Sequence, residues 1–335
     1  MITADIILDS ISPANKRLTT WVLTYPRFVH AEVMTHRVFS RNASSSRAIP
    51  ITKLLEAVKT NPAMPVWWGK NQSGMQANEQ LDDTKQDFFR SYEIKNEDGL
   101  ITAKMSGMSA LKAAKLDWLD ARDQAVVSVR KLMEVGLHKQ IANRVIEPWT
   151  HITVILSGTE FENFFSLRAH KDAQPEFQEL ANIMLEKYNV STPQNVDYDK
   201  WHIPFGDKLD DNRIMATEAW KKETDGMAFG LSGDIQNYLN DFRLKIATAR
   251  CARVSYLNFE GKDDYESDIA LADRLASSGH WSPFEHCATP LTSDHLSSGM
   301  VSPSNFVGWV QYRKHFSDTE NRTDSRVIKK FYQTS

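Results

Sequence analysis

Residues 35–50 contain the densest group of side chains that could bind a charged ligand. Their sixteen positions hold one His, three Arg, one Asn and four Ser. Burying three guanidinium groups is costly unless each is paired, so this composition is not typical of a core segment. Guanidinium charge, hydroxyl groups and the backbone N–H groups of a small-residue loop are the groups that bind anions. The segment therefore indicates a site for an anionic ligand, with a solvated basic loop as the alternative.

Arg168 is a second candidate, because it follows a run of aromatic residues. The helical spacing i, i+3, i+4 and i+7 joins Phe161, Phe164, Phe165 and Arg168. That spacing places the guanidinium on the apolar face of a helix. One interpretation is an Arg at a helix end, paired with a carboxylate such as Glu176. The other is a desolvated Arg that meets a planar or anionic ligand.

The other candidate groups give weaker signals. An i,i+3 surface pair with Glu147 would explain Arg144 adequately. His280 and His286 are six residues apart with Pro283 between them, which does not match the helical spacing of a zinc pair. The sequence contains neither Gly-x-Gly-x-x-Gly nor Gly-x-x-x-x-Gly-Lys. A nucleotide or flavin would therefore bind outside a Rossmann or P-loop scaffold.

The composition limits the class of protein. A net charge of −3 argues against a general nucleic-acid-binding protein, because basic residues are concentrated locally instead. Cys251 and Cys287 are too few for a disulfide framework, which indicates a reducing compartment. The sequence has no signal-peptide pattern and no apolar run near the roughly 18 residues of a membrane span. We expect a cytoplasmic protein with no membrane segment and no nucleic-acid partner.

The hydrophobic pattern predicts the elements that must position these residues. No linker or low-complexity tract divides the 335 residues, so one compact unit is expected. Two stretches, residues 51–107 and 190–245, read as irregular insertions. The predicted elements are strands within residues 4–25, a helix over 26–36, a long helix over 109–135, further helices over 141–147, 160–168 and from 175, a strand at 252–256 and a helix near 266–278.

Three blocks of the sequence resemble the flavin-dependent thymidylate synthases, also called thymidylate synthase complementing proteins. The first block resembles the family's Arg-His-Arg signature and reads His36-Arg37-x-x-Ser40-x-Asn42-x-x-Ser45-x-Arg47. The second runs from Thr150 through Asn163-Phe164-Phe165-Ser166-Leu167-Arg168 to Ala173-Gln174-x-Glu176. The third joins Ala252-Arg253-Val254-Ser255-Tyr256 to Gly279-His280-x-Ser282-Pro283-Phe284-Glu285-His286.

The order and some residues of these blocks depart from the family pattern. The third block ordinarily precedes the first, so its later place here resembles a circular permutation. If that is so, residues 280–286 must lie beside residues 36–47 in the folded chain. The family has Arg, Glu, Tyr and Gln where this sequence has Thr35, Ala43, Ala48 and Glu32.

The resemblance implies an α+β fold with a mixed sheet and long helices in permuted segment order. It implies a single catalytic unit over 1–335, with the signature and helical half in 1–190 and the His-x-Ser-Pro-Phe-Glu-His half in 245–335. The implied assembly is a homotetramer whose sites are built from several subunits. The implied reaction is a flavin-dependent methyltransferase reaction: dUMP becomes dTMP, FAD is the cofactor, and NADPH and methylenetetrahydrofolate are co-substrates. No cysteine nucleophile is needed.

The resemblance also implies roles for individual residues. Arg168 would be the catalytic group, stabilising negative charge on the uracil ring. The residues implied to bind dUMP are Glu32, Ser44, Ser45, Ser46, Arg47, Arg144 and Arg168. Those implied to contact FAD are His36, Arg37, Ser157, Thr159, Asn163, His280 and Ser282, and no metal ligand is implied. Two alternatives stay open: a related flavin-dependent pyrimidine nucleotide-modifying enzyme such as a hydroxymethylase, and a non-catalytic nucleotide-binding homologue.

Overall fold

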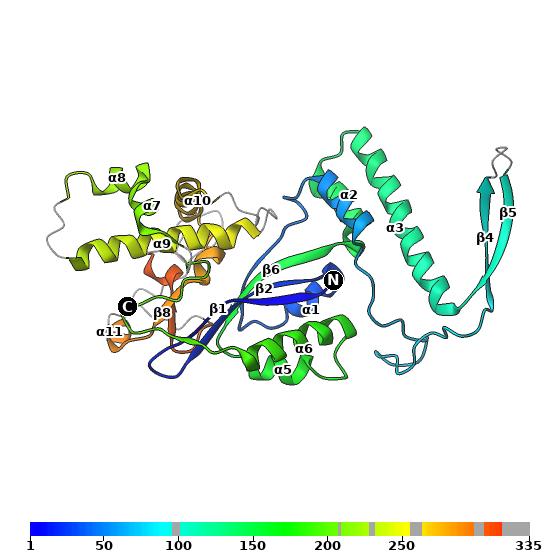
Figure 1. The fold of residues 1–335 in the computed structure, drawn as a ribbon, viewed down its shortest axis with the longest axis horizontal. Helices are drawn as coiled ribbons and strands as arrows, with labels where there is room; N and C mark the ends of the chain where they lie inside the picture. Colours follow the sequence, from blue (N-terminus) through cyan, green and yellow to red (C-terminus); the bar gives the residue numbers. More distant parts are fainter. Residues whose placement is uncertain (96–100, 207–208, 228–231, 255–262, 298–304, 317–335) are drawn as a thin grey trace, which may run out of the picture.

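Apolar residues near the N-terminus build two strands of a five-stranded sheet. The computed structural model describes residues 1–95, 101–206, 209–227, 232–254, 263–297 and 305–316 (Figure 1). Strands β1 (Thr3–Ile11) and β2 (Arg17–Pro26) form an antiparallel pair, which confirms the strands predicted within residues 4–25. The other strands are β3 (Ser40–Ala43), β6 (His151–Gly158) and β7 (Gln194–Asn195), in the order β3-β6-β2-β1-β7. Only β7 is parallel to its neighbour, so the sheet is mixed.

Both faces of this sheet are covered, because β6 is apolar along most of its length. On one face, Val154 and Leu156 pack with helices α5 (Glu162–Arg168) and α6 (Pro175–Val190). On the other face, Ile155 packs with Cys251 and Val254 at the end of helix α9 (Ser232–Arg253). Figure 1 shows α5 and α6 together beneath the strands. The helices predicted over 160–168 and from 175 are confirmed.

A long helix and a hairpin extend from one end of the sheet. Helix α3 (Ala110–Glu134) confirms the helix predicted over 109–135; Ser109 accepts a hydrogen bond from the Lys112 N–H at its start. The hairpin of β4 (Phe88–Lys95) and β5 (Ile101–Met108) projects beyond it (Figure 1). Helix α2 (Ile51–Thr60) packs on the same end of the molecule. The prediction that residues 51–107 are irregular is therefore wrong for α2 and the hairpin, since α2 has its own apolar stripe.

Two short helical stretches differ from their predictions. The helix predicted over 26–36 is a 3₁₀ turn, η1 (Arg27–Val29), followed by α1 (His30–Val33). It ends early because the Arg41 guanidinium donates hydrogen bonds to the carbonyls of Val33 and His36. The helix predicted over 141–147 is α4 (Lys139–Ala142) followed by the 3₁₀ helix η2 (Asn143–Trp149). Pro148 lies inside η2, where its missing N–H excludes a regular α-helix.

A helical layer forms beside the sheet, and much of it comes from residues that were predicted to be irregular or extended. It contains α7 (Asp211–Met215), α8 (Glu218–Thr224), α9 and α10 (Tyr265–Ser278), and the last of these confirms the helix predicted near 266–278. The strand predicted at 252–256 is wrong, because α9 continues to Arg253; residues 255 and 256 lie outside the described residues. The prediction of irregular structure over 190–245 is wrong for α7, α8 and most of α9.

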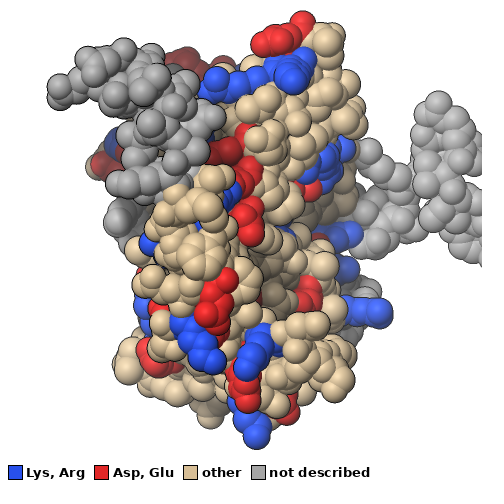
Figure 2. All heavy atoms as spheres, turned by 90° about the vertical axis from the view of Figure 1, so that its right-hand side faces the viewer, with Lys and Arg blue, Asp and Glu red and all other residues tan. Residues whose placement is uncertain are grey.

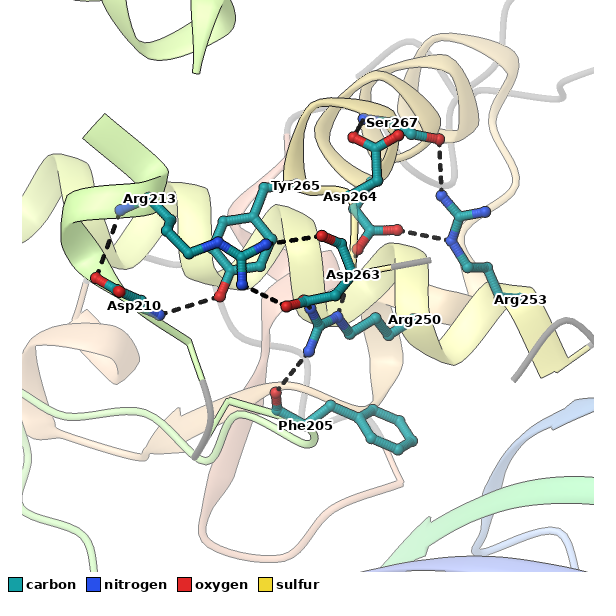
Figure 3. A network of polar contacts seen from close by, with 10 residues as sticks. Phe205, Asp210, Arg213, Arg250, Arg253, Asp263, Asp264, Tyr265 and Ser267 are labelled. Atoms are coloured by element: carbon teal, nitrogen blue, oxygen red, sulfur yellow. Dashed lines mark hydrogen bonds and ion pairs between the residues drawn. The ribbon is translucent and has the colours of Figure 1, made fainter. Parts of the chain in front are cut away.

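Ion pairs explain why α9 stays helical to its end. Arg250 and Arg253 lie three residues apart and both donate to the buried carboxylate of Asp268 on α10, at 3.3 and 2.6 Å. Asp263 accepts from Arg250 and from Arg213 on α7, as Figure 3 shows. Residues three apart lie on the same side of a helix, so both arginines reach Asp268 when this segment is helical. The ion pairs therefore favour a helix, although the local sequence pattern is typical of a strand.

The C-terminal segment returns to the sheet at β3. It contains η4 (Ser282–Glu285), β8 (Ala288–Pro290), α11 (Ser293–Ser297), β9 (Trp309–Gln311) and η5 (Tyr312–His315). The Ser40 hydroxyl donates to Glu285 at 2.8 Å, and Arg313 donates to the other oxygen of Glu285 at 2.6 Å. Residues 282–285 therefore lie beside β3, so the proximity expected between residues 280–286 and 36–47 is confirmed for η4 and β3. In the described part of the chain, no helix is long and apolar enough to cross a membrane.

Replacing Glu285 with Ala should destabilise the protein by about 1.5–3 kcal/mol, the range for hydrogen bonds to a charged group. The substitution leaves the half-buried Arg313 and the buried Ser40 without their shared acceptor. Urea unfolding measures the change. As a control, Glu79→Ala removes an exposed pair with Lys70 and should change stability by less than about 1 kcal/mol. Equal losses in the two variants would show that the Glu285 contacts do not hold the C-terminal segment to the sheet.

Candidate functional site

A cleft of about 1160 Å³ opens beside Arg168, between the start of α6 and the segment 65–78. Its apolar wall contains Phe28, Trp67 and Trp118. Its cationic groups are Arg168 and Lys171, and they are outnumbered by five carboxylates: Glu32, Asp172, Glu176, Glu179 and Glu186. Concave sites that combine aromatic walls with a few polar groups are typical of small-molecule binding. The aromatic wall suits a ligand with a planar ring, and only the part of the cleft near Arg168 and Lys171 suits an anionic or carbonyl group.

Arg168 has partners that hold its guanidinium without fully neutralising it. Its Nε donates to His36 Nε2 at 2.9 Å, and its Nη1 lies 3.8 Å from Glu32 Oε2. The guanidinium also lies 4.8 Å from the centre of the Phe177 ring. The predicted position on the apolar helix face is confirmed. Pairing with Glu176 is wrong, because Glu176 accepts hydrogen bonds from the Val66 N–H and the Gln174 side chain instead.

His36 is neutral in this arrangement. Burial, reinforced by the charges of Arg168 and Arg41, lowers its pKa to about 4. Its ring packs edge-on against Phe164 and Phe177. Since Arg168 donates to Nε2, the neutral ring must carry its proton on Nδ1. A neutral acceptor fixes the direction of the guanidinium and leaves the charge of Arg168 in place.

The segment 65–78 is held across the cleft by hydrogen bonds. The Val66 N–H donates to Glu176 at 2.8 Å, and the Gln76 side chain donates to the Asp172 carbonyl. The Trp67 indole donates to the Ala77 carbonyl at 3.1 Å. Sequence analysis missed Trp67, Gln76 and Lys171 as site residues. Paired tryptophans next to a glycine in a polar loop were the available signal, but nothing local indicated which surface they would face.

The serine-rich loop forms a second polar cluster. The Ser44 hydroxyl accepts from the Thr153 N–H at 3.0 Å, and the Ser46 hydroxyl donates to Glu147 at 2.6 Å. Arg144 donates to the same Glu147 oxygen at 2.9 Å, which confirms the surface pair that the spacing predicted. Arg47 is exposed, with no polar partner among the described residues. The groups left for a ligand are therefore chiefly Ser45 and Arg47.

Buried hydrogen bonds hold this loop rigidly. The Asn143 amide, which is fully buried, donates to the carbonyls of Ser46 and Ile49 at 2.6 and 3.1 Å. Arg27 donates to the Ser44 carbonyl at 3.2 Å. Because neighbouring elements fix the loop backbone, binding at Ser45 and Arg47 orders only their side chains and not the loop.

The residues implied to contact FAD do not gather at the cleft. Of these, only His36 reaches it, through Arg168. The Ser157 hydroxyl is fully buried and bonded to Thr20 and His286 at 2.7 and 2.8 Å, so it holds the fold in this chain. Thr159 accepts a hydrogen bond from the Val307 N–H. The remaining four are exposed and scattered: Arg37, Asn163, His280 and Ser282.

The surface charge and the positions of possible metal-binding side chains limit the kinds of ligand to consider. Figure 2 shows acidic and basic side chains interspersed on the face that it presents. Such a surface suits a small ligand better than a nucleic-acid duplex. Within the described ranges, no three His, Cys, Asp or Glu side chains gather in a way that could hold a metal ion.

The fold is α+β, and it carries two candidate polar clusters, one around Arg168 and one in the serine-rich loop. A family model described as thymidylate synthase complementing protein matches residues 10–194. This match covers more than half of the chain and includes both clusters. The chain therefore belongs to this family, the flavin-dependent thymidylate synthases, as the resemblance indicated. No curated protein matches the sequence.

The low pKa of His36 has a consequence for stability. Its folded value of about 4 lies below the ordinary value of 6.5, so between these pH values the unfolded chain binds the proton and the folded chain does not. Acidification from pH 6.5 to 4 should therefore remove stability, by up to about 1.4 kcal/mol per pH unit.

The variant His36→Gln lacks this titration but keeps a hydrogen-bond acceptor for Arg168. The difference in unfolding free energy between wild type and variant should shrink as the pH falls from 6.5 to 4. Between pH 7 and 8 it should stay constant, because His36 is neutral in both states. Urea titrations across the range measure it, and a constant difference down to pH 4 would contradict a buried neutral His36.

Proposed function

We propose that this protein is a flavin-dependent thymidylate synthase that methylates dUMP to dTMP with methylenetetrahydrofolate and NADPH. The observation that carries the proposal is the position of Arg168. Its guanidinium is directed by a neutral histidine at the wall of an aromatic cleft, within the region that the family model matches. A non-catalytic nucleotide-binding protein would not need an Arg held in this way.

In this proposal Arg168 acts on the pyrimidine ring. A planar guanidinium beside the ring would stabilise the negative charge that develops there when N3 loses its proton. His36 orients the guanidinium but is itself neutral, so the positive charge of Arg168 remains available to the ring. Glu32, at 3.8 Å from the guanidinium, would lie beside the uracil.

The residues around the cleft fit a flavin in part. Trp67 and Trp118 offer apolar surface to a fused ring system, while Lys171 and Gln76 offer donors to carbonyl or phosphate oxygens. FAD, when bound and reduced by NADPH, would supply the hydride that completes the methyl group. Arg37, Asn163, His280 and Ser282 do not line this cleft, so their contact with FAD stays an expectation from the resemblance. Ser157 and Thr159 support the neighbouring backbone.

A complete site on this proposal combines two copies of the chain. Among the described residues, no hydrogen bond or ion pair joins the Arg168 cluster to the serine-rich loop. Within residues 135–145, the apolar side chains of Val135, Leu137, Ile141 and Val145 are exposed, which suits an interface. We therefore propose a homotetramer in which residues 1–335 act as one catalytic unit and each nucleotide meets both clusters.

The decisive experiment is product analysis. Purified protein should show flavin absorbance, and incubation with dUMP, NADPH and methylenetetrahydrofolate should give dTMP. A C5-hydroxymethyl product would support a related hydroxymethylase instead. Nucleotide binding without flavin or turnover would support a non-catalytic homologue.

Replacing Arg168 with Lys separates the catalytic interpretation from a structural one. Lysine keeps the charge but is a compact point charge on a flexible stem. The variant should fold and bind FAD, yet lose about 10²–10³-fold in turnover, the size expected for one preorganised electrostatic donor. NADPH oxidation in the absence of dUMP should persist. Near-normal methylation by this variant would return Arg168 to a helix-end role.

Replacing Arg47 with Ala tests the serine-rich loop. Nucleotide binding should weaken by about 1.5–3 kcal/mol, the range for a hydrogen bond to a charged group, while flavin content changes little. Calorimetry with dUMP measures the affinity. Arg274→Ala, which removes an exposed Arg on α10, is the matched control and should bind dUMP normally. Unchanged affinity in Arg47→Ala would place the phosphate elsewhere.

A further inference from the structure

Glu147 lies where a nucleotide phosphate is proposed to bind, although a carboxylate repels a phosphate. One of its oxygens accepts both from the Ser46 hydroxyl at 2.6 Å and from Arg144 at 2.9 Å. These two donors come from different segments, the loop after β3 and the helix η2. The contact is therefore more than a pair along one helix surface. The Glu147 side chain is 23% exposed, so solvent and ligands can reach it.

The carboxylate changes what the loop can offer. Ser46 and Arg144 already have an anionic acceptor within the chain, and the charge of Glu147 also reaches the half-buried Arg27, whose pKa burial lowers and Glu147 raises. A phosphate that takes these donors must displace the carboxylate and remain close to it. Two like charges a few ångströms apart repel each other substantially near a protein surface.

We propose that Glu147 is an internal counter-ion that a phosphate displaces, and that it sets the affinity of the loop for phosphate-bearing ligands. This inference rests on the proposed function in assigning a nucleotide phosphate to the serine-rich loop. With no ligand, Glu147 keeps Ser46 and Arg144 in position and neutralises Arg144. With a phosphate bound, both donors turn to the ligand, and the repulsion from Glu147 lowers the affinity.

The test compares Glu147→Gln with wild type in binding dUMP and deoxyuridine, which lacks the phosphate. Glutamine keeps an oxygen acceptor for Ser46 and removes the charge. Affinity for dUMP should rise roughly fivefold at low salt, with a smaller rise at high salt, while deoxyuridine affinity is unchanged. Glu56→Gln, at an exposed position on α2, is the control and should show no change. Thermal unfolding verifies that the variants are folded.

Two outcomes overturn the inference: dUMP affinity in Glu147→Gln that is unchanged or weaker, or a gain that deoxyuridine shares. Titration with inorganic phosphate separates this inference from the proposed function. If wild-type protein makes no dTMP but Glu147→Gln binds inorganic phosphate more tightly than wild type, the proposed function fails and the counter-ion stands. If dTMP forms and phosphate binds both forms equally, the proposed function stands and the counter-ion fails.

Discussion

Burial of β6 on both faces is the constraint on which the rest of the structure depends. This strand pairs with β2 on one side and β3 on the other, so it fixes where the loop after β3 begins. The chain then passes from the end of β6 directly into α5, which carries Arg168. One apolar strand therefore sets the positions of both polar clusters, although neither cluster contains a β6 side chain.

The two arginine clusters differ in how their charge is compensated. Arg168 donates to a neutral imidazole, and its nearest carboxylate is 3.8 Å away. Arg144 donates directly to a carboxylate that a serine also uses. The positive charge of an arginine with a neutral partner remains available to a ligand. An arginine paired with a carboxylate must give up that partner before it can bind an anionic ligand. This contrast supports a catalytic role for the first and a binding role for the second.

The C-terminal segment joins the sheet through buried polar contacts. A hydrogen-bonded chain runs from Ser10 through His202, Thr20 and Ser157 to His286. Burial lowers the pKa of both histidines to about 3, so they remain neutral and serve as hydrogen-bonding partners. The resemblance implied that Ser157 contacts FAD, but its hydroxyl is fully buried and already has two hydrogen-bonding partners. It therefore supports the fold, because few of its hydrogen bonds remain for a ligand.

The sequence by itself determined the strong periodic elements, the family and the helix face that carries Arg168. Helix α3, α5 and α6 follow from apolar spacing, and Arg168 lies on the predicted face because that spacing is local. Local spacing also predicted the pair of Arg144 with Glu147, but only the tertiary structure decided which carboxylate Arg168 meets. Glu32 was 136 positions from Arg168, and Glu176, much nearer in the chain, was already bonded to Val66. The extension of α9 through residues 252 and 253 was decided in the same way, by ion pairs to Asp268 that no local pattern encodes. Contacts between distant segments depend on how the elements pack, and packing is a property of the whole chain.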